Sequence, residues 1–321
     1  MTGCNSIATF DPSTLSDLSG KVYLITGGNA GIGYQTALSL AQHHATVYIG
    51  CRSQAKGQAA ITSIQSLFPE AKLRLLILDH MDLSSVVAAA KNLAFQQPKL
   101  HGLINNAGIM AVPFNKSKDG YESQWQTNYL SHWVLTYHLL PMLLAAAKGS
   151  KPGDVRIVNV TSMGHAMAPK GGIDFEDINQ EKGGLWSRYG QSKLGNILHA
   201  KYLNSLYGPN GSEKEQGEIW TAAVHPGNVY TDLNRNARFL GRLSPMVAAL
   251  LNATGVYITP EQGAYSSLFC AASEEFGKGE SGKYFVPLGK EKLPSKYALD
   301  EKLAVKLWEW TEGEMVKKSV L

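Results

Sequence analysis

TGGNAGIGYQ (residues 26–35) is the most informative segment of this chain. It follows the apolar run KVYLIT (21–26) and leads into the helical period of GYQTALSLAQHH, so it forms the first turn of a β-α-β unit. Its glycines fit the pattern TGxxxGxG, and glycine allows a pyrophosphate to approach backbone N–H groups at a helix N-terminus. The segment therefore predicts a dinucleotide site. Its expected members are Gly27, Asn29, Gly31, Ile32 and Gly33.

Short aliphatic runs alternate with helical segments along the rest of the chain, a pattern typical of a parallel sheet covered on both faces. The expected strands are 21–26, 46–51, 73–78, 102–105, 155–160, 218–224 and 283–287. Seven strands predict one α/β domain over residues 1–321, a Rossmann-type doubly wound parallel sheet with helices on both faces.

Composition excludes several classes of protein. The 321 residues are 44% hydrophobic and carry a net charge of only +4, without a run of five or six basic residues, so no nucleic-acid partner is expected. Three cysteines without a CxxC pair predict neither a disulfide framework nor a metal site, and they fit a reducing compartment. No stretch of about 18 consecutive apolar residues or signal peptide is evident, so we expect a cytoplasmic protein without a membrane span.

The end of the second strand, GCRSQAK, predicts which dinucleotide binds. An acidic residue there would hold a ribose 2′-hydroxyl, but this chain has Arg52, whose guanidinium suits a 2′-phosphate. We therefore expect NADP(H) over NAD, with a solvated surface arginine as the alternative. Asp79, after the third strand, is expected to contact the adenine amino group; Asp82 competes for this role or caps a helix. After the fourth strand, INNAGIM places the small or polar Asn105, Asn106, Ala107 and Gly108 beside the adenosine ribose.

YGQSK (189–193) follows the loop-like run GGLWSR. On a helix, Tyr189 and Lys193 project from one face, so a phenol and an ammonium can share a cavity. By itself this spacing equally describes an interfacial tyrosine beside a solvated lysine.

With TGxxxGIG, NNAG and YGQSK in this order, the chain resembles the short-chain dehydrogenase/reductase family over essentially its whole length. TGGNAGIG, LINNAGIM, VNVTS, YGQSKLGNILHAKYL and VHPGNVYT are most similar to its retinol dehydrogenase and WW-domain oxidoreductase branch and to fungal members. The resemblance implies a single Rossmann domain. It also implies hydride transfer between NAD(P)H and a carbonyl or alcohol.

The resemblance places the catalytic residues at Asn128, Ser162, Tyr189 and Lys193. Tyr189 would exchange the proton, and Lys193 would lower its pKa and bind the nicotinamide ribose. Ser162, with Thr161 as its nearest competitor, would hold the substrate oxygen. Asn128 would hold a water of a proton relay, or would make a purely structural hydrogen bond.

HPGNVYTDL, after the sixth strand, completes the expected cofactor site with Pro226, Val229 and Thr231. His225 is not assigned a catalytic role, because the tyrosine already supplies the proton chemistry.

Two segments are expected to shape the substrate site. Ser162 and Tyr189 are 27 residues apart, which is long for the family, so residues 163–188 are interpreted as an insertion that covers the entrance or obstructs assembly faces. The chain would then be a monomer or a homodimer. Residues 228–259 are a candidate lid.

Met110, Met163, Met167, Trp186 and the aliphatic 239–258 segment favour a hydrophobic small-molecule substrate, which fits secondary metabolism. A non-redox isomerase or cyclase on this scaffold and an NADP(H)-sensing binding protein are the alternative functions.

Overall fold

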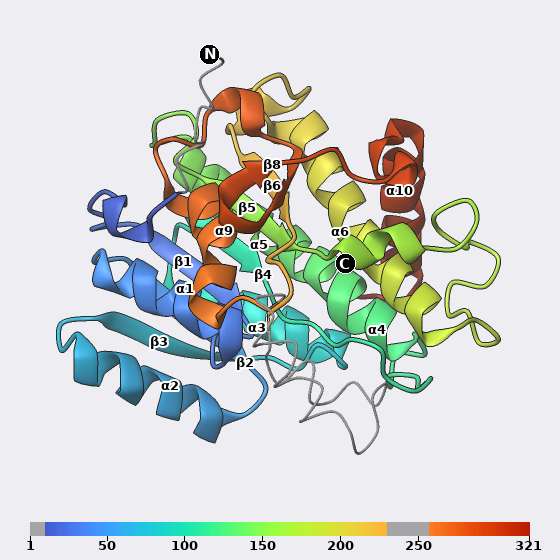
Figure 1. Cartoon of the computed structure of the whole chain (residues 1–321), viewed down its shortest axis with the longest axis horizontal. Helices are drawn as coiled ribbons and strands as arrows, with labels where there is room; N and C mark the ends of the chain where they lie inside the picture. The colour runs from blue at the N-terminus through green and yellow to red at the C-terminus, as the bar shows by residue number, and fades with distance from the viewer. Residues whose placement is uncertain (1–9, 230–256) are drawn as a thin grey trace, which may run out of the picture.

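The computed structural model describes residues 10–229 and 257–321. They form a single α/β domain around one sheet, whose strands lie in the order β3-β2-β1-β4-β5-β6-β7-β8 (Figure 1). The first seven strands are parallel, with β8 antiparallel to β7. The strands are β1 (Val22–Thr26), β2 (Thr46–Cys51), β3 (Lys72–Ile77), β4 (Gly102–Asn105), β5 (Arg156–Val160), β6 (Trp220–Val224), β7 (Lys283–Val286) and β8 (Lys290–Glu291).

All seven expected strands are present, each within two residues of its expected limits. The eighth, β8, has no counterpart in the sequence reasoning. It consists of Lys290 and Glu291, both exposed, so it lacks the apolar alternation that identifies a strand. Its existence depends on register with β7, where Phe285 is opposite Glu291 and Val286 is opposite Lys290.

Helices cover both faces of the sheet. One face carries α1 (Gly31–Gln42), α2 (Gln54–Leu67) and α9 (Pro260–Ala272); the other carries α3 (Leu83–Gln96), α5 (Ser131–Ala147) and α6 (Leu185–Tyr207), with α10 (Glu301–Lys317) outside α6 (Figure 1). Strand residues alternate between the two cores, so Leu24 packs on the α3 side and Ile25 on the α1 side.

Local sequence explains where several helices begin. The side chains of Ser53, Asp82 and Asp300 accept hydrogen bonds from backbone N–H groups in the first turns of α2, α3 and α10. Thr259 and Gln262 form a capping box at α9, and Pro260 stands at its first position. Helix α6 begins at Leu185, so the end of the loop-like run GGLWSR is helical and Tyr189 lies in the second turn.

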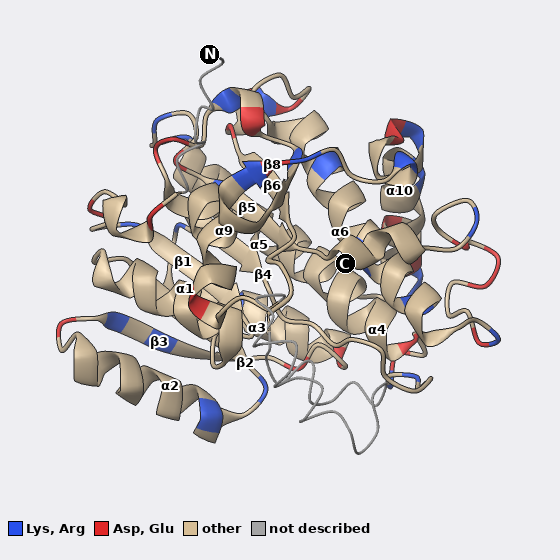
Figure 2. Cartoon of the chain, in the orientation of Figure 1, with Lys and Arg blue, Asp and Glu red and all other residues tan. Residues whose placement is uncertain are grey.

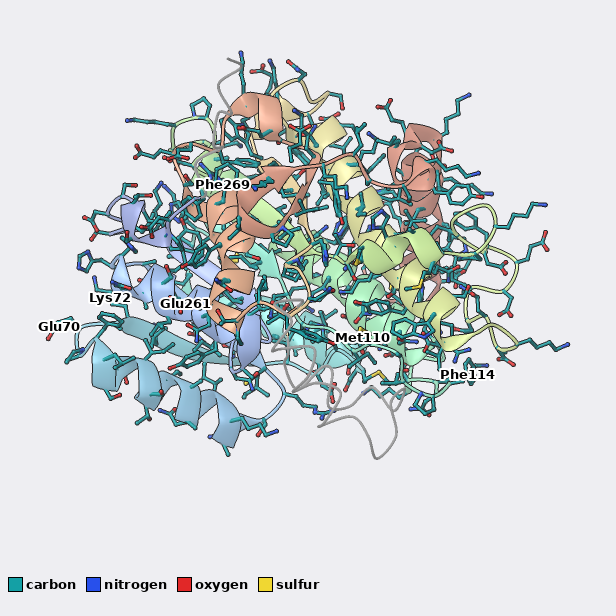
Figure 3. The ribbon with its side chains drawn as sticks, viewed as in Figure 1. Glu70, Lys72, Met110, Phe114, Glu261 and Phe269 are labelled. Carbon is teal, nitrogen blue, oxygen red and sulfur yellow. The ribbon has the colours of Figure 1, made fainter. Side chains whose placement is uncertain are left out.

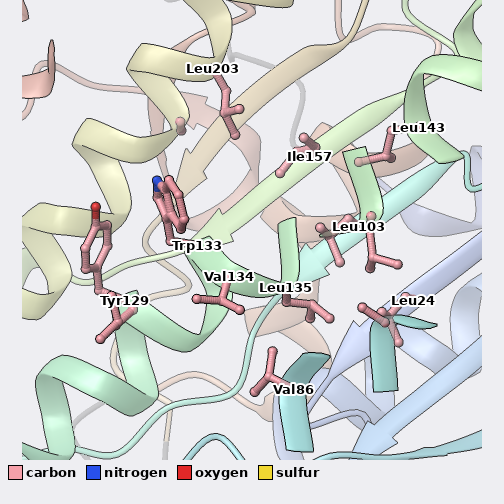
Figure 4. Packing of buried hydrophobic residues seen from close by; sticks show 14 of the residues in the cluster. Leu24, Val86, Leu103, Tyr129, Trp133, Val134, Leu135, Leu143, Ile157 and Leu203 are labelled. Atoms are coloured by element: carbon pink, nitrogen blue, oxygen red, sulfur yellow. The ribbon is translucent and has the colours of Figure 1, made fainter. Parts of the chain in front are cut away.

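One described helical stretch, Ser123–Ala147, is long and apolar enough to cross a membrane by length and composition alone. It comprises a short helix α4 (Ser123–Trp125), a π-helical turn η2 (Gln126–Leu130) and α5. In this fold its side chains pack in the core, where Leu135 belongs to the same buried cluster as Leu103 and Leu24 of the sheet (Figure 4). Trp133 faces the outer helices, with its ring 4.9 Å from that of Trp308. The central position of α5 between sheet and outer helices accounts for this apolar composition.

Positively and negatively charged residues are interspersed over the outer helices and loops in the view of Figure 2. This distribution agrees with the small net charge of +4.

Candidate active site

A cleft of about 690 Å³ opens at the carboxyl ends of the central strands. An adjoining cleft of about 590 Å³ shares Gly27, Arg52 and Gly108 with it and extends toward the ends of β2 and β3. Met110 lines the first cleft and lies on the loop that follows β4. In Figure 3 it lies on the other side of the view from Glu70 and Lys72, which are near β3. Open α/β sheets bind ligands at the carboxyl ends of their strands, where the first cleft opens.

The glycine turn after β1 is shaped for a ligand that approaches the backbone. Gly27 and Gly31 adopt positive φ angles of 66° and 54°, which favour glycine. A Cβ at Gly33 would lie 2.4 Å from the Gly27 carbonyl oxygen, so no larger residue fits there. Helix α1 begins at Gly31 without a side-chain cap, which leaves its first N–H groups for an anion. Asn29 and Ile32 also line the cleft.

Thr26 connects this turn to the loop after β4. Its hydroxyl oxygen accepts hydrogen bonds from the backbone N–H groups of Asn106 and Ala107, each at 2.9 Å. Asn106, Ala107 and Gly108 all line the first cleft.

Asn105 was expected beside the adenosine ribose, but it lines neither of the two clefts. Asn105 is the last residue of β4, and its side chain points into the core, where its amide donates to Asn159 (2.8 Å) and Thr136 (3.1 Å). Consecutive strand residues face opposite sides, so Asn106 takes the position on the cleft.

Two basic side chains stand where the adenosine is expected. Arg52 lines both clefts, and Lys56, one turn into α2, lines the adjoining one. The sequence reasoning missed Lys56, although it stands in the same segment, GCRSQAK, as Arg52. Asp79 lines the same cleft and accepts a hydrogen bond from the Met81 N–H at 2.9 Å. Asp82 instead caps α3, the alternative role expected for it, pairs with Lys118 and lines neither cleft.

Tyr189, Ser162 and Lys193 meet on the floor of the first cleft. The Ser162 side chain lies beside the Tyr189 hydroxyl and acts to lower its pKa. The Lys193 Nζ lies 5.9 Å from the centroid of the Tyr189 ring and donates to the Val160 carbonyl at 3.0 Å. Phenol and ammonium thus lie on one side of α6, as the i, i+4 spacing predicts.

Burial dominates the titration of this pair. It raises the pKa of Tyr189 to about 12, although Ser162 acts in the opposite direction. It also lowers the pKa of Lys193 to about 7. In the protein alone, burial and Ser162 set the pKa of Tyr189, and the lowering expected from Lys193 does not appear.

The side chains of Thr161 and Ser162 make different contacts. The Thr161 hydroxyl donates to the Lys193 carbonyl at 2.7 Å and so ties β5 to α6. The Ser162 oxygen accepts from the Gly164 N–H at 3.1 Å at the start of a 3-10 turn, η3 (Met163–Met167), and faces Tyr189. Both residues line the first cleft, but the Thr161 hydroxyl is bonded to α6 and the Ser162 side chain lies beside the phenol.

Asn128 lies within the π-helical turn η2 and is fully buried. Its side-chain oxygen accepts from the Ile109 N–H at 2.8 Å, and its amide donates to the Ile109 carbonyl and the Ser192 hydroxyl, both at 2.9 Å. These are structural bonds between the loop after β4 and α6. A Cβ at Gly108 would lie 3.1 Å from the Asn128 oxygen and 3.3 Å from the Lys193 Nζ, so both side chains converge on Gly108. π-Helical turns frequently occur at functional sites.

The segment after β6 closes the first cleft opposite Tyr189, with Pro226 and Val229 in its lining. His225 also lines it; burial lowers its pKa to about 4, so its ring is neutral at pH 7. Thr231 and residues 230–256 of the candidate lid lie outside the described residues. The two ends of that segment meet, because Val229 pairs with Ile258 and the Ile258 N–H donates to the Asn228 carbonyl at 2.9 Å.

Apolar side chains line the cleft around Tyr189. They include the four expected ones, Met110, Met163, Met167 and Trp186, together with Tyr257, which belongs to the expected 239–258 segment. Residues 239–256 of that segment lie outside the described residues. The Trp186 ring stands edge-on to Tyr189 at 6.1 Å between centroids.

Residues 163–188 are anchored at several points. The His165 Nε2 accepts from the Ser295 N–H at 3.0 Å, and the Gln191 side chain of α6 bonds the Asp174 N–H and the Ile178 carbonyl. Near its end, buried Arg188 lies 3.7 Å from buried Glu122. This pair, which the sequence reasoning missed, joins the chain before Tyr189 to the loop before α4. Its members are 66 positions apart in the sequence, so no local pattern links them.

Comparisons with known proteins agree with this geometry. A family model described as short chain dehydrogenase matches residues 21–175. A short-chain dehydrogenase/reductase of Aspergillus calidoustus is 56% identical over 97% of this chain and 98% of the relative. Retinol dehydrogenase 12 of Mus musculus is 37% identical over 92% of this chain and 86% of its own length.

Solved structures share the fold. A putative uncharacterized protein from Mycobacterium paratuberculosis superposes with a TM-score of 0.71 at 29% identity, covering 96% of this chain and 97% of that structure. A carbonyl reductase from chicken fatty liver, solved with NADPH bound, has a TM-score of 0.63 at 23% identity, covering 89% and 99%. The chain belongs to the short-chain dehydrogenase/reductase family.

Proposed function

We propose that this oxidoreductase uses NADP(H) to interconvert a carbonyl and an alcohol on a hydrophobic small molecule. The observation that carries the proposal is that Tyr189, Ser162 and Lys193 line one cleft, with the Lys193 Nζ 5.9 Å from the Tyr189 ring centroid, and that this cleft continues to the glycine turn after β1. The turn fits a dinucleotide, since a Cβ at Gly33 would fill the space over the Gly27 backbone. The bound cofactor would supply or accept the hydride.

The chain's own groups manage the proton and the substrate oxygen. With a pKa near 12, Tyr189 stays protonated at neutral pH and can donate its proton to the oxygen of a carbonyl undergoing reduction. Ser162 donates to the same oxygen and fixes its distance from the phenol. Lys193 stabilises the phenolate that forms, and Asn128 is proposed to order a water between Lys193 and solvent.

Arg52 and Lys56 support the preference for NADP(H). Both line the adjoining cleft at the end of β2, where two cations can hold a 2′-phosphate. Two fold neighbours, the chicken carbonyl reductase and RhlG of Pseudomonas aeruginosa, are described as complexes with NADPH and NADP.

The apolar lining around Tyr189 supports a hydrophobic substrate, because the cleft offers four methionine and tryptophan side chains and no carboxylate among its described residues. A role in secondary metabolism and a cytoplasmic location complete the proposal. Helix α10 covers the outer side of α6, which favours a monomer, or a homodimer formed through another surface.

Steady NADPH oxidation with a panel of apolar ketones and aldehydes tests the proposal. Tyr189→Phe should abolish turnover while the dissociation constant for NADPH changes less than about threefold, because the lost hydroxyl serves the proton. Full activity of Tyr189→Phe would contradict the proton-transfer role. NADPH binding without turnover of any compound would instead favour the sensor function. Conversion of a substrate without net NADPH consumption would favour an isomerase or cyclase.

A further inference from the structure

A buried histidine that the proposed reaction does not use lies between the two halves of the site. His132, the second residue of α5, is 1% exposed and contacts Thr26 at the end of β1 and Asn128 in the π-helical turn. The ring nitrogen nearer the His132 backbone, Nδ1, lies 2.9 Å from the Asn128 carbonyl oxygen. The ring nitrogen farther from the backbone, Nε2, lies 2.8 Å from the Thr26 hydroxyl.

The partners determine the tautomer of His132. A carbonyl oxygen can only accept, so Nδ1 carries the hydrogen and donates it to Asn128. Burial, with the nearby His80 ring, holds the pKa of His132 well below its ordinary value, so the ring is neutral at pH 7. Nε2 therefore offers a lone pair, and the Thr26 hydroxyl donates to it.

Because the Thr26 hydroxyl donates to His132, its oxygen can accept hydrogen bonds from the loop after β4. A hydroxyl has one hydrogen and two lone pairs. With its hydrogen directed to His132, both lone pairs of Thr26 are free for the N–H groups of Asn106 and Ala107. A Cβ at Gly27 would lie within 3.2 Å of both residues, so this contact also sets the spacing between the two nucleotide-binding turns.

The other end of His132 faces the catalytic helix. Asn128, whose carbonyl accepts from the ring, bonds Ile109 and the Ser192 hydroxyl, and that hydroxyl in turn donates to the Tyr189 carbonyl at 2.8 Å. We propose that His132 is a positioning residue whose two nitrogens separately hold the cofactor-binding turns, through Thr26, and the proton-relay turn, through Asn128. The inference rests on the proposed function for the second of these effects only.

Two amide substitutions separate the nitrogens, since the asparagine amide reaches about as far as Nδ1 and the glutamine amide about as far as Nε2. His132→Asn should keep the bond to Asn128 and lose the acceptor for Thr26, weakening NADPH binding about tenfold with kcat nearly unchanged. His132→Gln should keep the acceptor for Thr26 and lose the donor to Asn128, lowering kcat about tenfold with NADPH affinity nearly unchanged.

His138→Asn and His138→Gln are the matched controls, because His138 lies on the same helix and its Nε2 bonds only the Val320 carbonyl, at 2.9 Å, in the described structure. NADPH affinity is measured by fluorescence titration, kcat at saturating NADPH and stability by thermal unfolding. The opposite pattern for the two His132 variants, or equal losses of affinity and kcat in both, would overturn the inference.

A further variant, Thr26→Val, covers the case in which a His132 variant fails to fold. It should weaken NADPH binding at least as much as His132→Asn, and the two changes together should weaken it no further than Thr26→Val alone. Additive losses would overturn the cofactor half of the inference. The affinity measurements do not depend on turnover, so absence of turnover in the wild-type protein would count against the proposed function and leave this half testable.

Discussion

At the scale of single residues, Lys193 combines a proposed catalytic role with an unfavourable environment. Burial lowers its pKa from 10.5 to about 7, so the folded protein resists the charge that the unfolded chain accepts readily. Buried ionisable groups of this kind are common at active sites, where function opposes stability.

We predict that Lys193→Met raises the free energy of unfolding at pH 7 while it reduces turnover. Between pH 7 and 10.5 the unfolded wild-type chain binds one more proton at this residue than the folded chain, so wild-type stability rises with pH across this window. The advantage of the variant should be on the order of a few kcal/mol at or below pH 7 and should shrink toward pH 10.5. The Val160 carbonyl keeps a partner in the variant, because the Asn196 amide also donates to it at 3.0 Å.

Urea unfolding of both proteins at pH 6, 8 and 9.5 measures the effect. A difference in unfolding free energy that stays constant with pH would refute the burial of a charged ammonium at this position.

Arg52 tests cofactor choice at the same scale. Arg52→Asp should weaken NADPH binding at least about tenfold more than it weakens NADH binding, because the carboxylate repels a 2′-phosphate and tolerates a ribose hydroxyl. Arg74→Asp is the matched control, since Arg74 is exposed on β3 and lines neither cleft. Dissociation constants for both nucleotides decide the matter, and equal weakening of the two would remove Arg52 from the phosphate site.

At the scale of elements, the 3-10 turn η3 packs against the Tyr189 ring and restrains its position. A Cβ at Gly164 would lie 2.7 Å from the Tyr189 ring, which is shorter than real contacts. A Cβ at Gly190 would lie 2.5 Å from the Met167 carbonyl carbon, so α6 and η3 also meet at a second glycine. The closeness of these two elements, rather than a feature of either alone, orients the phenol.

We predict that Gly164→Ala lowers kcat at least about tenfold with little change in NADPH affinity, because the added methyl displaces the phenol and leaves the nucleotide turns untouched. Gly184→Ala serves as the control: Gly184 precedes α6, has a negative φ, and a Cβ there would meet nothing within 4 Å. Steady-state kinetics of the two variants should differ by this factor. Equal kinetics would mean that η3 does not restrain Tyr189.

At the scale of the whole molecule, α10 closes the core over α5 and α6. The Trp308 ring stacks on Tyr202 of α6 at 4.7 Å between centroids and contacts Trp133 of α5 at 4.9 Å. The Thr311 hydroxyl bonds the Tyr129 hydroxyl at 2.8 Å in the same interface. The C-terminal helix thus belongs to the core that supports the catalytic helix.

Trp308→Ala should lower the free energy of unfolding by about 3–5 kcal/mol, the range for removal of a buried tryptophan. Glu309→Ala, one position along and exposed, should change it by less than about 0.5 kcal/mol. Chemical denaturation provides both values. A loss below about 1 kcal/mol for Trp308→Ala would show that α10 contributes little to this core.

Much of this organisation follows from the sequence because it is encoded locally. The period of apolar residues placed all seven parallel strands, and the glycines at 27, 31 and 33 placed the turn between β1 and α1. The i, i+4 spacing placed Tyr189 and Lys193 on one side of α6. Backbone sterics and helical geometry act over a few residues, so a short segment is sufficient to reveal them.

Other features arise only where distant segments meet. The tertiary structure turned Asn105 into the core and Asn106 toward the cleft, separated the tasks of Thr161 and Ser162, and paired Arg188 with Glu122. It also set the pKa values of Tyr189 and Lys193 through burial by neighbouring elements. The direction of a side chain at a strand end and its exposure to water depend on packing between segments far apart in the chain, and no local pattern records that packing.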